Sequence, residues 1–407
     1  MRKTNNYPFV LVHGYLCWGN DDRINDICPL FGMWNGSAKE ALQDAGYIAD
    51  TPSVGMFSGM WDRACELYAF IKGGRVDYGK VHSARNGHQR FGKTYPGYVP
   101  NWGELDDEGK IQKINLIGHS FGGPTVRTLI HLLAEGSELE REGTDPDDLS
   151  PLFEGGKVKW VHSCTTLAGT HNGVTLPEQI ERFVKPIAFT VFSLGPLISG
   201  TKLAKIYGFH LDRFGISSQT KHIGYDPTLV LHYVNLKEDN IHWELSREGA
   251  QELTKDYKVY DNIYYFSYYG VRTEENKKGG QSGTKDMWLP MRPFGWMTGN
   301  LKKEKLGKEW LPNDGLVNIP AAHHPFKDPW QDFDAANIKP GIWNVMPQEY
   351  KDHTSYMGVL EDKEVYKTSS SRSQTVSPTF RSSNKTFYKP SKGLASAGPF
   401  SYNRGTS

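Results

Sequence analysis

The chain has 407 residues, of which 38% are hydrophobic and 23% are charged, so it is long enough to bury a full core. Its 47 basic and 46 acidic side chains nearly cancel, which leaves no sustained positive field of the kind that binds a phosphate backbone. Nucleic acid is therefore not an expected partner. The longest mildly apolar stretch, 183–198, contains Lys185 and two prolines and is too short for a transmembrane helix.

The N-terminus and the cysteines bear on the compartment. The first apolar run, 8–12, is too short for the hydrophobic region of a signal peptide. Cys17, Cys28, Cys65 and Cys164 are scattered without metal-like spacing, which is typical of reduced thiols. The sequence therefore predicts a cytoplasmic protein, or a secreted one if a leader has been removed.

Strands and helices alternate along most of the chain. Short β-branched or apolar runs predict strands, and longer runs with helical spacing predict helices. In chain order these are a strand at 9–12, a helix at 38–45, a strand at 114–117, a helix at 125–133, and strands at 158–167 and 263–269. Such alternation predicts an α/β fold with a mostly parallel sheet covered by helices on both faces.

Two insertions interrupt this pattern within a single predicted domain, 1–362, and a tail follows that domain. Residues 57–102, rich in Gly, His, Arg and Tyr, predict a small inserted subdomain, and the helical apolar pattern of 176–218 predicts a cap or lid. Residues 363–407 contain eleven serines and eight Lys or Arg against one Glu, with hardly any aliphatic residues. We expect this segment to be a disordered basic tail, because it cannot bury enough surface to offset its ordering entropy.

The sequence Gly118-His119-Ser120-Phe121-Gly122 lies between a predicted strand and a predicted helix. Gly-x-Ser-x-Gly in this setting is typical of a nucleophile elbow, the sharp turn that exposes the reactive serine of an α/β-hydrolase. The amide of Phe121, at the start of the helix, is a candidate donor to the oxyanion of a tetrahedral intermediate. The alternative is a glycine-rich turn that merely ends a strand.

A second oxyanion donor is expected in the loop after the first strand. His13-Gly14-Tyr15 follows that strand directly, and the Tyr15 amide is the candidate. A plain turn without a catalytic role is the alternative interpretation.

A serine hydroxyl needs a base and an orienting carboxylate, which in this fold follow in the order Ser, Asp or Glu, His. Asp314 lies in a polar turn that enters an apolar run, although the same Asp-Gly pair also suits an ordinary turn. His353 lies in a loop before the C-terminal apolar segment, where the base of such a fold is expected. The adjacent pair His323-His324 is the main rival for the base.

Three residues of the first insertion have metal-like character. His82 and His88 are six residues apart on a glycine-rich loop, and Asp62 precedes them by twenty residues. Imidazole and carboxylate together suit zinc, whereas a merely solvated histidine-rich loop is the alternative.

Several longer sequence segments extend these motifs. Together with the motifs, they make the sequence resemble the zinc-containing bacterial lipases of the thermostable Geobacillus and staphylococcal type. The resemblance runs from the first strand to about Leu360. Besides 118–122, the segments are Trp61-Asp62-Arg63-Ala64-Cys65-Glu66, 76–79, 88–97, 150–156, Asn313-Asp314-Gly315-Leu316-Val317-Asn318, Gly341-Ile342-Trp343-Asn344 and Asp352-His353 before Met357-Gly358.

The resemblance implies an α/β-hydrolase fold, catalytic roles for Ser120, Asp314 and His353, and a zinc site that includes Asp62, His82 and His88. For the fourth zinc ligand the family has an aspartate in a Tyr-Asp-Leu-Ser context. The similar segment here is Trp243-Glu244-Leu245-Ser246, which makes Glu244 the expected ligand.

Two departures from the family pattern change the expectations. Phe121 replaces the usual glutamine, which the oxyanion role tolerates because only the amide is needed. The family also has a calcium site after the catalytic histidine, but Ser355 and Leu360 occupy the positions of its acidic ligands, so no calcium is expected.

These observations together predict a serine ester hydrolase, a lipase or carboxylesterase, with structural zinc and no organic cofactor. Its expected partners are lipid or other carboxylic esters and, transiently, a lipid surface that the exposed face of an opened cap would contact. The alternative is a non-catalytic hydrolase-fold protein that binds a lipid or another ligand, since fold does not dictate function.

Overall fold

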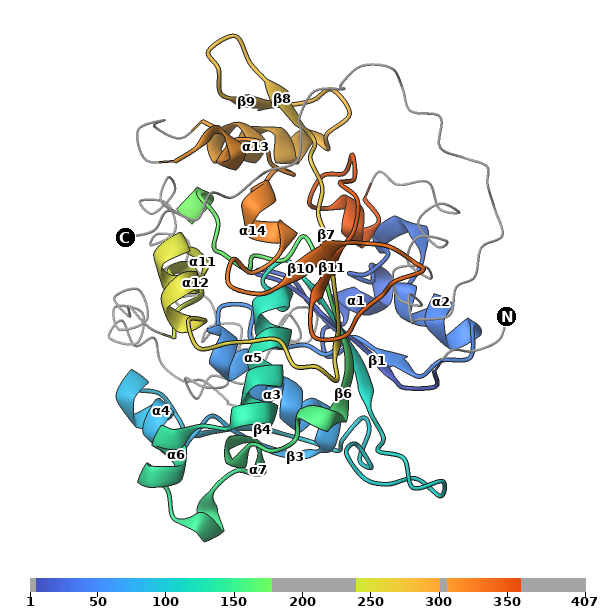
Figure 1. The fold of residues 1–407 in the computed structure, drawn as a ribbon, viewed down its shortest axis with the longest axis vertical. Helices are drawn as coiled ribbons and strands as arrows, with labels where there is room; N and C mark the ends of the chain where they lie inside the picture. The colour runs from blue at the N-terminus through green and yellow to red at the C-terminus, as the bar shows by residue number, and fades with distance from the viewer. Residues whose placement is uncertain (1–4, 178–238, 301–305, 360–407) are drawn as a thin grey trace.

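The computed structural model describes residues 5–177, 239–300 and 306–359. A seven-stranded sheet forms its centre, with the strand order β10-β11-β7-β6-β5-β1-β2, and every neighbouring pair is parallel (Figure 1). Its strands are β1 (Phe9–Val12), β2 (Ala49–Asp50), β5 (Ile114–His119), β6 (Val161–Leu167), β7 (Tyr264–Tyr268), β10 (Trp330–Asp332) and β11 (Trp343–Val345). The predicted parallel sheet is therefore confirmed.

The structure shifts one predicted strand boundary. Residues Val158–Trp160 form a 3-10 helix instead of the first three residues of the predicted strand 158–167. The carbonyl of Trp160 accepts a hydrogen bond from the indole of Trp102 at 2.9 Å, and the two rings pack edge to face. The carbonyl of Trp160 is satisfied by this side chain, and pairing with β5 begins at Val161.

Helices cover both faces of the sheet, as the alternation predicts. Leucines and isoleucines recur at helical spacing in α5 (Gly122–Glu135), which packs with α3 (Met60–Lys72) on one face. The other helices of the described chain are α1 (Ile24–Ile27), α2 (Ala38–Asp44), α4 (Lys80–Asn86), α6 (Glu138–Gly143), α7 (Pro151–Glu154), α11 (Ile241–Leu245), α12 (Arg247–Leu253), α13 (Arg292–Thr298) and α14 (Ile319–His323).

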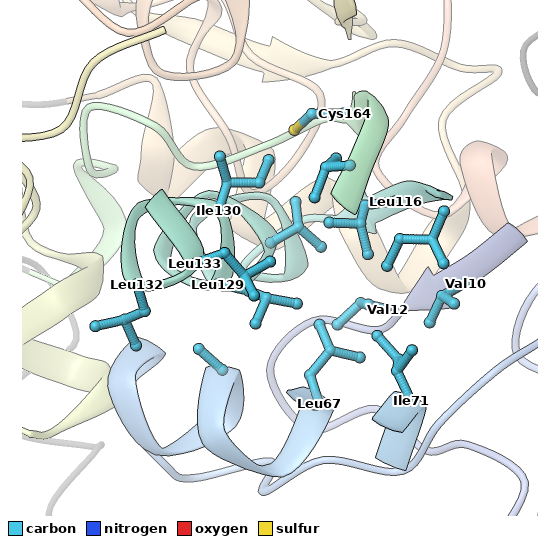
Figure 2. Packing of buried hydrophobic residues seen from close by; sticks show 14 of the residues in the cluster. Val10, Val12, Leu67, Ile71, Leu116, Leu129, Ile130, Leu132, Leu133 and Cys164 are labelled. Carbon is cyan, nitrogen blue, oxygen red and sulfur yellow. The ribbon is translucent and has the colours of Figure 1, made fainter. Parts of the chain in front are cut away.

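The alternation of side chains along β1 divides the core into two layers. Val10 and Val12 pack with the leucines of α3 and α5 on one face (Figure 2). Phe9 and Leu11 point to the other face, where they pack with Leu42 of α2. Because successive residues of a strand point to opposite faces, a four-residue apolar strand that is buried on both sides holds both layers together.

The direction of chain progression reverses between β1 and β5. After β1 the chain adds β2 on one side of the sheet, and after β5 it adds β6 on the other. Val12 pairs with Gly118, so the loops that leave these two strands start side by side. In open parallel sheets the crevice at such a reversal is where ligands bind. This position places His13-Gly14 against His119-Ser120.

The remaining strands form two small antiparallel pairs. One pairs β3 (Gly74–Asp77) with β4 (Phe91–Tyr95), and with α3 and α4 it occupies the predicted insertion 57–102. The other pairs β8 (Thr273–Glu275) with β9 (Gln281–Gly283).

Two of the predicted segments lie largely or wholly outside the described residues. From residue 178 onward the predicted cap, 176–218, lies outside the described residues, as does the whole predicted tail, 363–407. Among the helices that are described, none is long and apolar enough to cross a membrane.

The glycines at the start of α5 give a matched test of this packing. A Cβ on Gly122 would lie 2.2 Å from the carbonyl oxygen of Val12, whereas a Cβ on Gly123 would meet its nearest atom, the Cα of Gly169, at 3.1 Å. Both alanine substitutions gain about 1 kcal/mol of helix propensity. We expect Gly122→Ala to lower the free energy of unfolding by at least about 2 kcal/mol and Gly123→Ala to change it by less than about 1 kcal/mol, measured by denaturant titration. Equal effects would contradict the contact.

Candidate active site and metal centre

Ser120 lies in a sharp turn between β5 and α5. Its φ is +56°, in the left-handed region that strains a residue with a side chain. A Cβ on Gly118 would lie 2.3 Å from the carbonyl oxygen of Gly122, so glycine is required there. The amide of Ser120 donates to the carbonyl of Leu167 at 2.9 Å. The side chain is partly exposed, while its neighbours on both sides are buried.

The expected oxyanion donors lie in the two segments that border Ser120. A Cβ on Gly14 would lie 2.7 Å from the Cβ of Ser120, which shows how closely the loop after β1 approaches the serine. Tyr15 follows in that loop, and Phe121 is the N-cap residue of α5. Free amides at the start of a helix favour negative charge nearby.

Asp314 and His353 form a direct pair. The Nδ1 of His353 lies 2.9 Å from Oδ2 of Asp314, and both side chains are almost fully buried. The backbone amide of His353 also donates to the carbonyl of Asp314 at 2.8 Å. The other carboxylate oxygen, Oδ1, accepts from the amides of Leu316 and Val317 at 3.0 and 2.7 Å. The two amides fix the orientation of the carboxylate, so that its other oxygen, Oδ2, faces the imidazole.

His119, the residue before Ser120, also contacts His353. Its Nε2 lies 3.1 Å from the carbonyl oxygen of His353, and the ring centroids are 4.7 Å apart. Burial lowers the pKa of His119 well below its usual value, so the ring is neutral and donates through Nε2–H. The nucleophile turn and the histidine loop are thus joined by a hydrogen bond that sequence reasoning missed, although His119 stands inside the Gly-x-Ser-x-Gly motif.

The rival histidines lie elsewhere. His323 and His324 approach each other, with their Nδ1 atoms 2.6 Å apart, and both rings pack against Trp330. In the part of the chain that the structure describes, His353 is the only imidazole that pairs with the carboxylate of Asp314.

The loop that carries His353 is anchored by the residue before it. Oδ1 of Asp352 accepts from the amides and hydroxyls of Thr354 and Ser355, at 2.7 to 3.2 Å. Oδ2 accepts from the amide of Trp288 at 2.9 Å, which ties the loop to a distant segment. A buried carboxylate that accepts five hydrogen bonds holds a sharp turn firmly.

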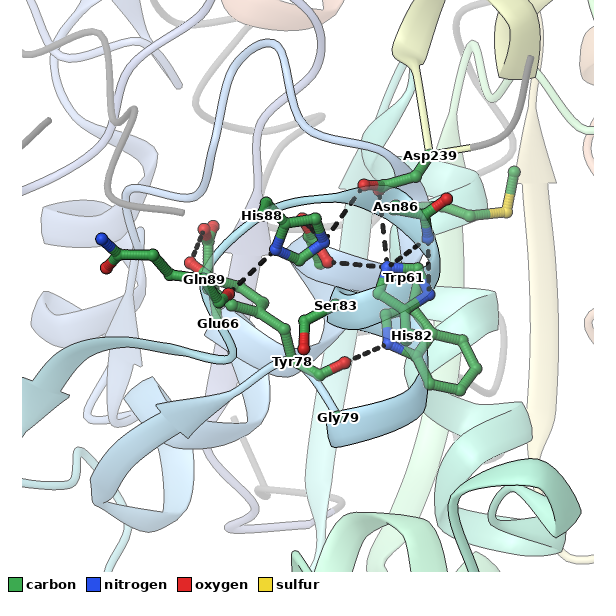
Figure 3. A network of polar contacts seen from close by, with 12 residues as sticks. Trp61, Glu66, Tyr78, Gly79, His82, Ser83, Asn86, His88, Gln89 and Asp239 are labelled. Atoms are coloured by element: carbon green, nitrogen blue, oxygen red, sulfur yellow. Dashed lines mark hydrogen bonds and ion pairs between the residues drawn. The ribbon is translucent and has the colours of Figure 1, made fainter. Parts of the chain in front are cut away.

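A second polar cluster joins the first insertion to the segment before α11 (Figure 3). Asp62 in the first turn of α3, His82 in α4, His88 after α4 and Asp239 before α11 each offer one ligand atom, and these atoms all lie within 4.8 Å of one another. Nε2 of His82 is 3.2 Å from Asp62 and 3.7 Å from Asp239, and Nε2 of His88 is 3.8 and 3.3 Å from the same carboxylates.

These distances fit a small tetrahedral ion. Ligand bonds of about 2.0–2.1 Å at tetrahedral angles hold the donor atoms roughly 3.3 Å apart. The Nδ1 of His88 lies 2.9 Å from the carbonyl oxygen of Gln89. This contact leaves the Nε2 of His88 directed toward the cluster, as a metal ligand requires. Burial alone would lower the pKa of His82, but hydrogen bonds to Asp239 and Asp62 outweigh it and raise the pKa to about 10. The carboxylates therefore strongly favour a cation at this position.

The expectation that Glu244 completes this set is corrected by the structure, which brings Asp239 to it. Oε2 of Glu244 accepts a hydrogen bond from the amide of Met60 at 2.5 Å and so caps the helix that carries Asp62. The Trp-Glu-Leu-Ser segment predicted Glu244 as the ligand, whereas Asp239 lies five residues earlier in the chain. A better sequence signal is Asn240, a typical N-cap residue that caps α11, because the preceding Asp239 then lies in the turn before the helix, where the structure gives it a φ of +54°.

Comparison with known proteins identifies the family of the chain. The family model for the "Lipase-like, C-terminal domain" matches residues 5–375. The chain belongs to this lipase-like family. A lipase of Staphylococcus epidermidis is 35% identical over 367 residues, and lipase 1 of Staphylococcus aureus is 35% identical over 362 residues. Each alignment covers 87% of this chain, and the chain spans about half the length of these curated relatives, 50% and 51%.

Solved structures of lipases share the fold of this family member. The Staphylococcus hyicus lipase has a TM-score of 0.78 at 30% identity, over 91% of this chain and 95% of that one. Lipase 1 from Pelosinus fermentans has a TM-score of 0.74 at 37% identity, over 91% and 99%. With its mostly parallel sheet and helices on both faces, the chain has the α/β-hydrolase fold predicted from the sequence.

The corrected ligand set can be tested with two isosteric amides. We expect Asp239→Asn to weaken retention of a divalent metal by more than about 100-fold, because it removes a charged donor atom. Glu244→Gln keeps an oxygen for the Met60 amide and should retain the metal within about tenfold of the unaltered protein. Dialysis against graded chelator followed by elemental analysis measures both. Equal metal loss in the two variants would return Glu244 to the ligand set.

Proposed function

We propose that this lipase-like protein is a serine carboxylic ester hydrolase that acts through Ser120, Asp314 and His353. The observation that carries the proposal is the buried pair of His353 and Asp314, joined at 2.9 Å and linked through His119 to the turn that exposes Ser120. The order of the three residues in the chain and the names of the relatives, which are lipases, support the same conclusion.

The reaction uses one proton shuttle. His353 takes the proton of the Ser120 hydroxyl as its oxygen attacks the ester carbonyl, and Asp314 stabilises the resulting imidazolium. The tetrahedral intermediate collapses, and His353 gives the proton to the departing alcohol, which leaves an acyl-enzyme. Water, deprotonated by His353, then attacks the acyl carbonyl. The second tetrahedral intermediate breaks its bond to the serine oxygen, which takes the proton back from His353, and the carboxylic acid is released.

The negative charge of each tetrahedral intermediate needs fixed donors. We assign them to the amides of Phe121 and Tyr15, which belong to the segments on either side of Ser120. Donors that are already in place cost no reorganisation during the reaction, so they stabilise the charge more than water does. No organic cofactor takes part.

The competing function is ligand binding without catalysis. The backbone strain at Ser120 argues against it, since a left-handed serine destabilises the fold and a ligand pocket does not require one. The buried carboxylate paired with a histidine likewise has no use in a simple lipid carrier.

Lipid esters are the proposed substrates. The relatives carry the name lipase, and the apolar pattern of 176–218 predicts a cap whose inner face would be exposed on opening. A movable apolar cap favours aggregated esters over dilute soluble ones, because it is more easily displaced at a lipid surface.

The ion of the second cluster is proposed to be zinc with a structural role. Two imidazoles and two carboxylates form a closed tetrahedral set, which leaves no position for a substrate water. Such an ion would hold α3, the α4 region and the segment before α11 together.

Calcium is not expected near the histidine loop. Ser355 offers only a hydroxyl, which already contacts Asp352, and the carboxylate of Asp352 is surrounded by N–H and O–H donors. A hard cation needs several charged oxygens that are free to turn toward it. The second position of the expected calcium pattern, Leu360, lies outside the described residues.

Triad variants test the catalytic proposal directly. We expect Ser120→Ala to keep its melting temperature and to lower kcat on chromogenic acyl esters by a factor on the order of 10⁴ or more. His353→Ala should lose activity to a similar extent. His323→Ala, which alters a histidine outside the proposed triad, should stay within about twofold of the unaltered protein. Turnover within tenfold of the unaltered rate in Ser120→Ala would remove the serine from its role, and comparable losses in the two histidine variants would mean that the base is misassigned.

The metal proposal predicts separate effects on stability and rate. Elemental analysis should find about one zinc per chain, and chelation should lower the melting temperature before it lowers turnover of a soluble ester at room temperature, because the ion is structural. Added calcium should leave the melting temperature unchanged. A metal-free protein with the same melting temperature would disprove the zinc site, and strong stabilisation by calcium would disprove its expected absence.

A further inference from the structure

Arg63 is a fully buried cation on α3, next to the metal-cluster residue Asp62. Its exposed fraction is 0%. The guanidinium donates to the carbonyl of Gly55 at 2.8 Å, to the hydroxyl of Thr125 at 2.9 Å and to the carbonyl of His13. Burial lowers the pKa of Arg63 to about 10, with partial compensation by Glu66, so the side chain stays charged at neutral pH.

Burying the charge of Arg63 costs free energy, which suggests that the residue has a specific role. Buried charges are usually paired with an opposite charge, yet among the described residues no carboxylate lies within salt-bridge distance of Arg63. Two backbone carbonyls and one hydroxyl satisfy it instead. A guanidinium presents several donors in a rigid planar fork, which makes it suited to hold separate chain segments at fixed distances.

The segments that Arg63 joins are those that border Ser120. His13 lies two residues before Tyr15 in the loop after β1. On the other side, the hydroxyl of Thr125 accepts from Nε of Arg63 and donates to the carbonyl of Phe121 at 2.9 Å. The ring of Phe121 also lies under the guanidinium, with Cζ 5.5 Å from its centroid. One cation thus contacts both expected halves of the oxyanion site.

We propose that Arg63, through the Thr125 hydroxyl, is a positioning residue that sets the separation of the Tyr15 and Phe121 amides. The proposal rests on the proposed function, since it concerns the geometry of its tetrahedral intermediates. Oxyanion donors act only when they point at the position that the charged oxygen will occupy, so a small displacement of either segment weakens catalysis more than substrate binding.

Thr125 offers the sharpest test, because a matched pair of variants separates its hydroxyl from its shape. Thr125→Val keeps the volume and removes the hydrogen bonds to Arg63 and Phe121, whereas Thr125→Ser keeps the hydroxyl. We expect Thr125→Val to lower kcat by about tenfold to a hundredfold with KM within about twofold, and Thr125→Ser to restore most of the rate. Binding of an alkyl boronic acid, which forms a tetrahedral adduct with the serine, should weaken by a similar factor in Thr125→Val.

Arg63 itself is tested with Arg63→Lys, which keeps the charge but loses the fork. The same fall in kcat and in boronic acid affinity is expected, with KM nearly unchanged. Metal content is measured in every variant, because Asp62 is the neighbouring residue and a lost ion would otherwise mimic the effect. Should Arg63→Lys fail to fold, the Thr125 pair alone decides.

The outcomes distinguish the two proposals. If the unaltered protein hydrolyses esters and folded Thr125→Val matches it in kcat and boronic acid affinity, Arg63 and Thr125 have only a structural role and the positioning proposal is overturned. A lower melting temperature without a change in kcat leads to the same conclusion. If the unaltered protein does not hydrolyse any ester while its fold and metal are intact, the proposed function fails, and the positioning proposal fails with it.

Discussion

At the carboxyl ends of β1 and β5 the two strands and the following helix approach so closely that no side chain fits between them. Cβ atoms on Gly14, Gly118 and Gly122 would each fall 2.2 to 2.7 Å from a neighbouring atom. This contact forces Ser120 into its left-handed conformation and places the start of α5 beside it. The direction reversal of the parallel sheet creates the crevice, and the glycines let the backbone close around its edge. The positions of both expected oxyanion segments follow from this one constraint.

Helix α3 extends that constraint to the rest of the molecule. Asp62 belongs to the candidate metal cluster, and the next residue, Arg63, donates to a carbonyl in the loop after β1. The first amide of the helix is capped by Glu244, which belongs to α11. A single thirteen-residue helix is therefore fixed at its N-terminal turn by groups from three distant parts of the chain. Its apolar residues pack in one dense core with those of α5, the helix that follows Ser120.

The histidine loop is fixed by a different means. Asp352 gathers five donors around one carboxylate, and His353 is held through its amide, its carbonyl and its ring. Hydrogen bonds to an ionised acceptor in a dry interior are stronger than those in water, and a fully satisfied network favours one conformation. The imidazole orientation is consequently set by the chain itself, before any substrate arrives.

The sequence alone determined the features that depend on local spacing and steric need. The β-branched and apolar runs predicted β1, most of β5, and β6 and β7 with boundaries one to three residues too wide, because such runs are typical of strands buried between two layers of helices. Gly118 and Gly122 identified the serine turn, since no other residue fits there. Asp62, His82 and His88 were recognisable by residue type and by resemblance to the lipase family.

Only the tertiary structure decided which distant residues meet. Asp239 and Glu244 both lie near Gly59, but the oxygen of Asp239 reaches the histidines while that of Glu244 reaches the amide of Met60. His353 and not His323 pairs with Asp314. The contact of His119 with His353 joins residues 234 apart in the chain, and that of Arg63 with His13 joins residues 50 apart. Spacing along a chain carries no information about such meetings, because they are fixed by how the helices and loops pack on the sheet.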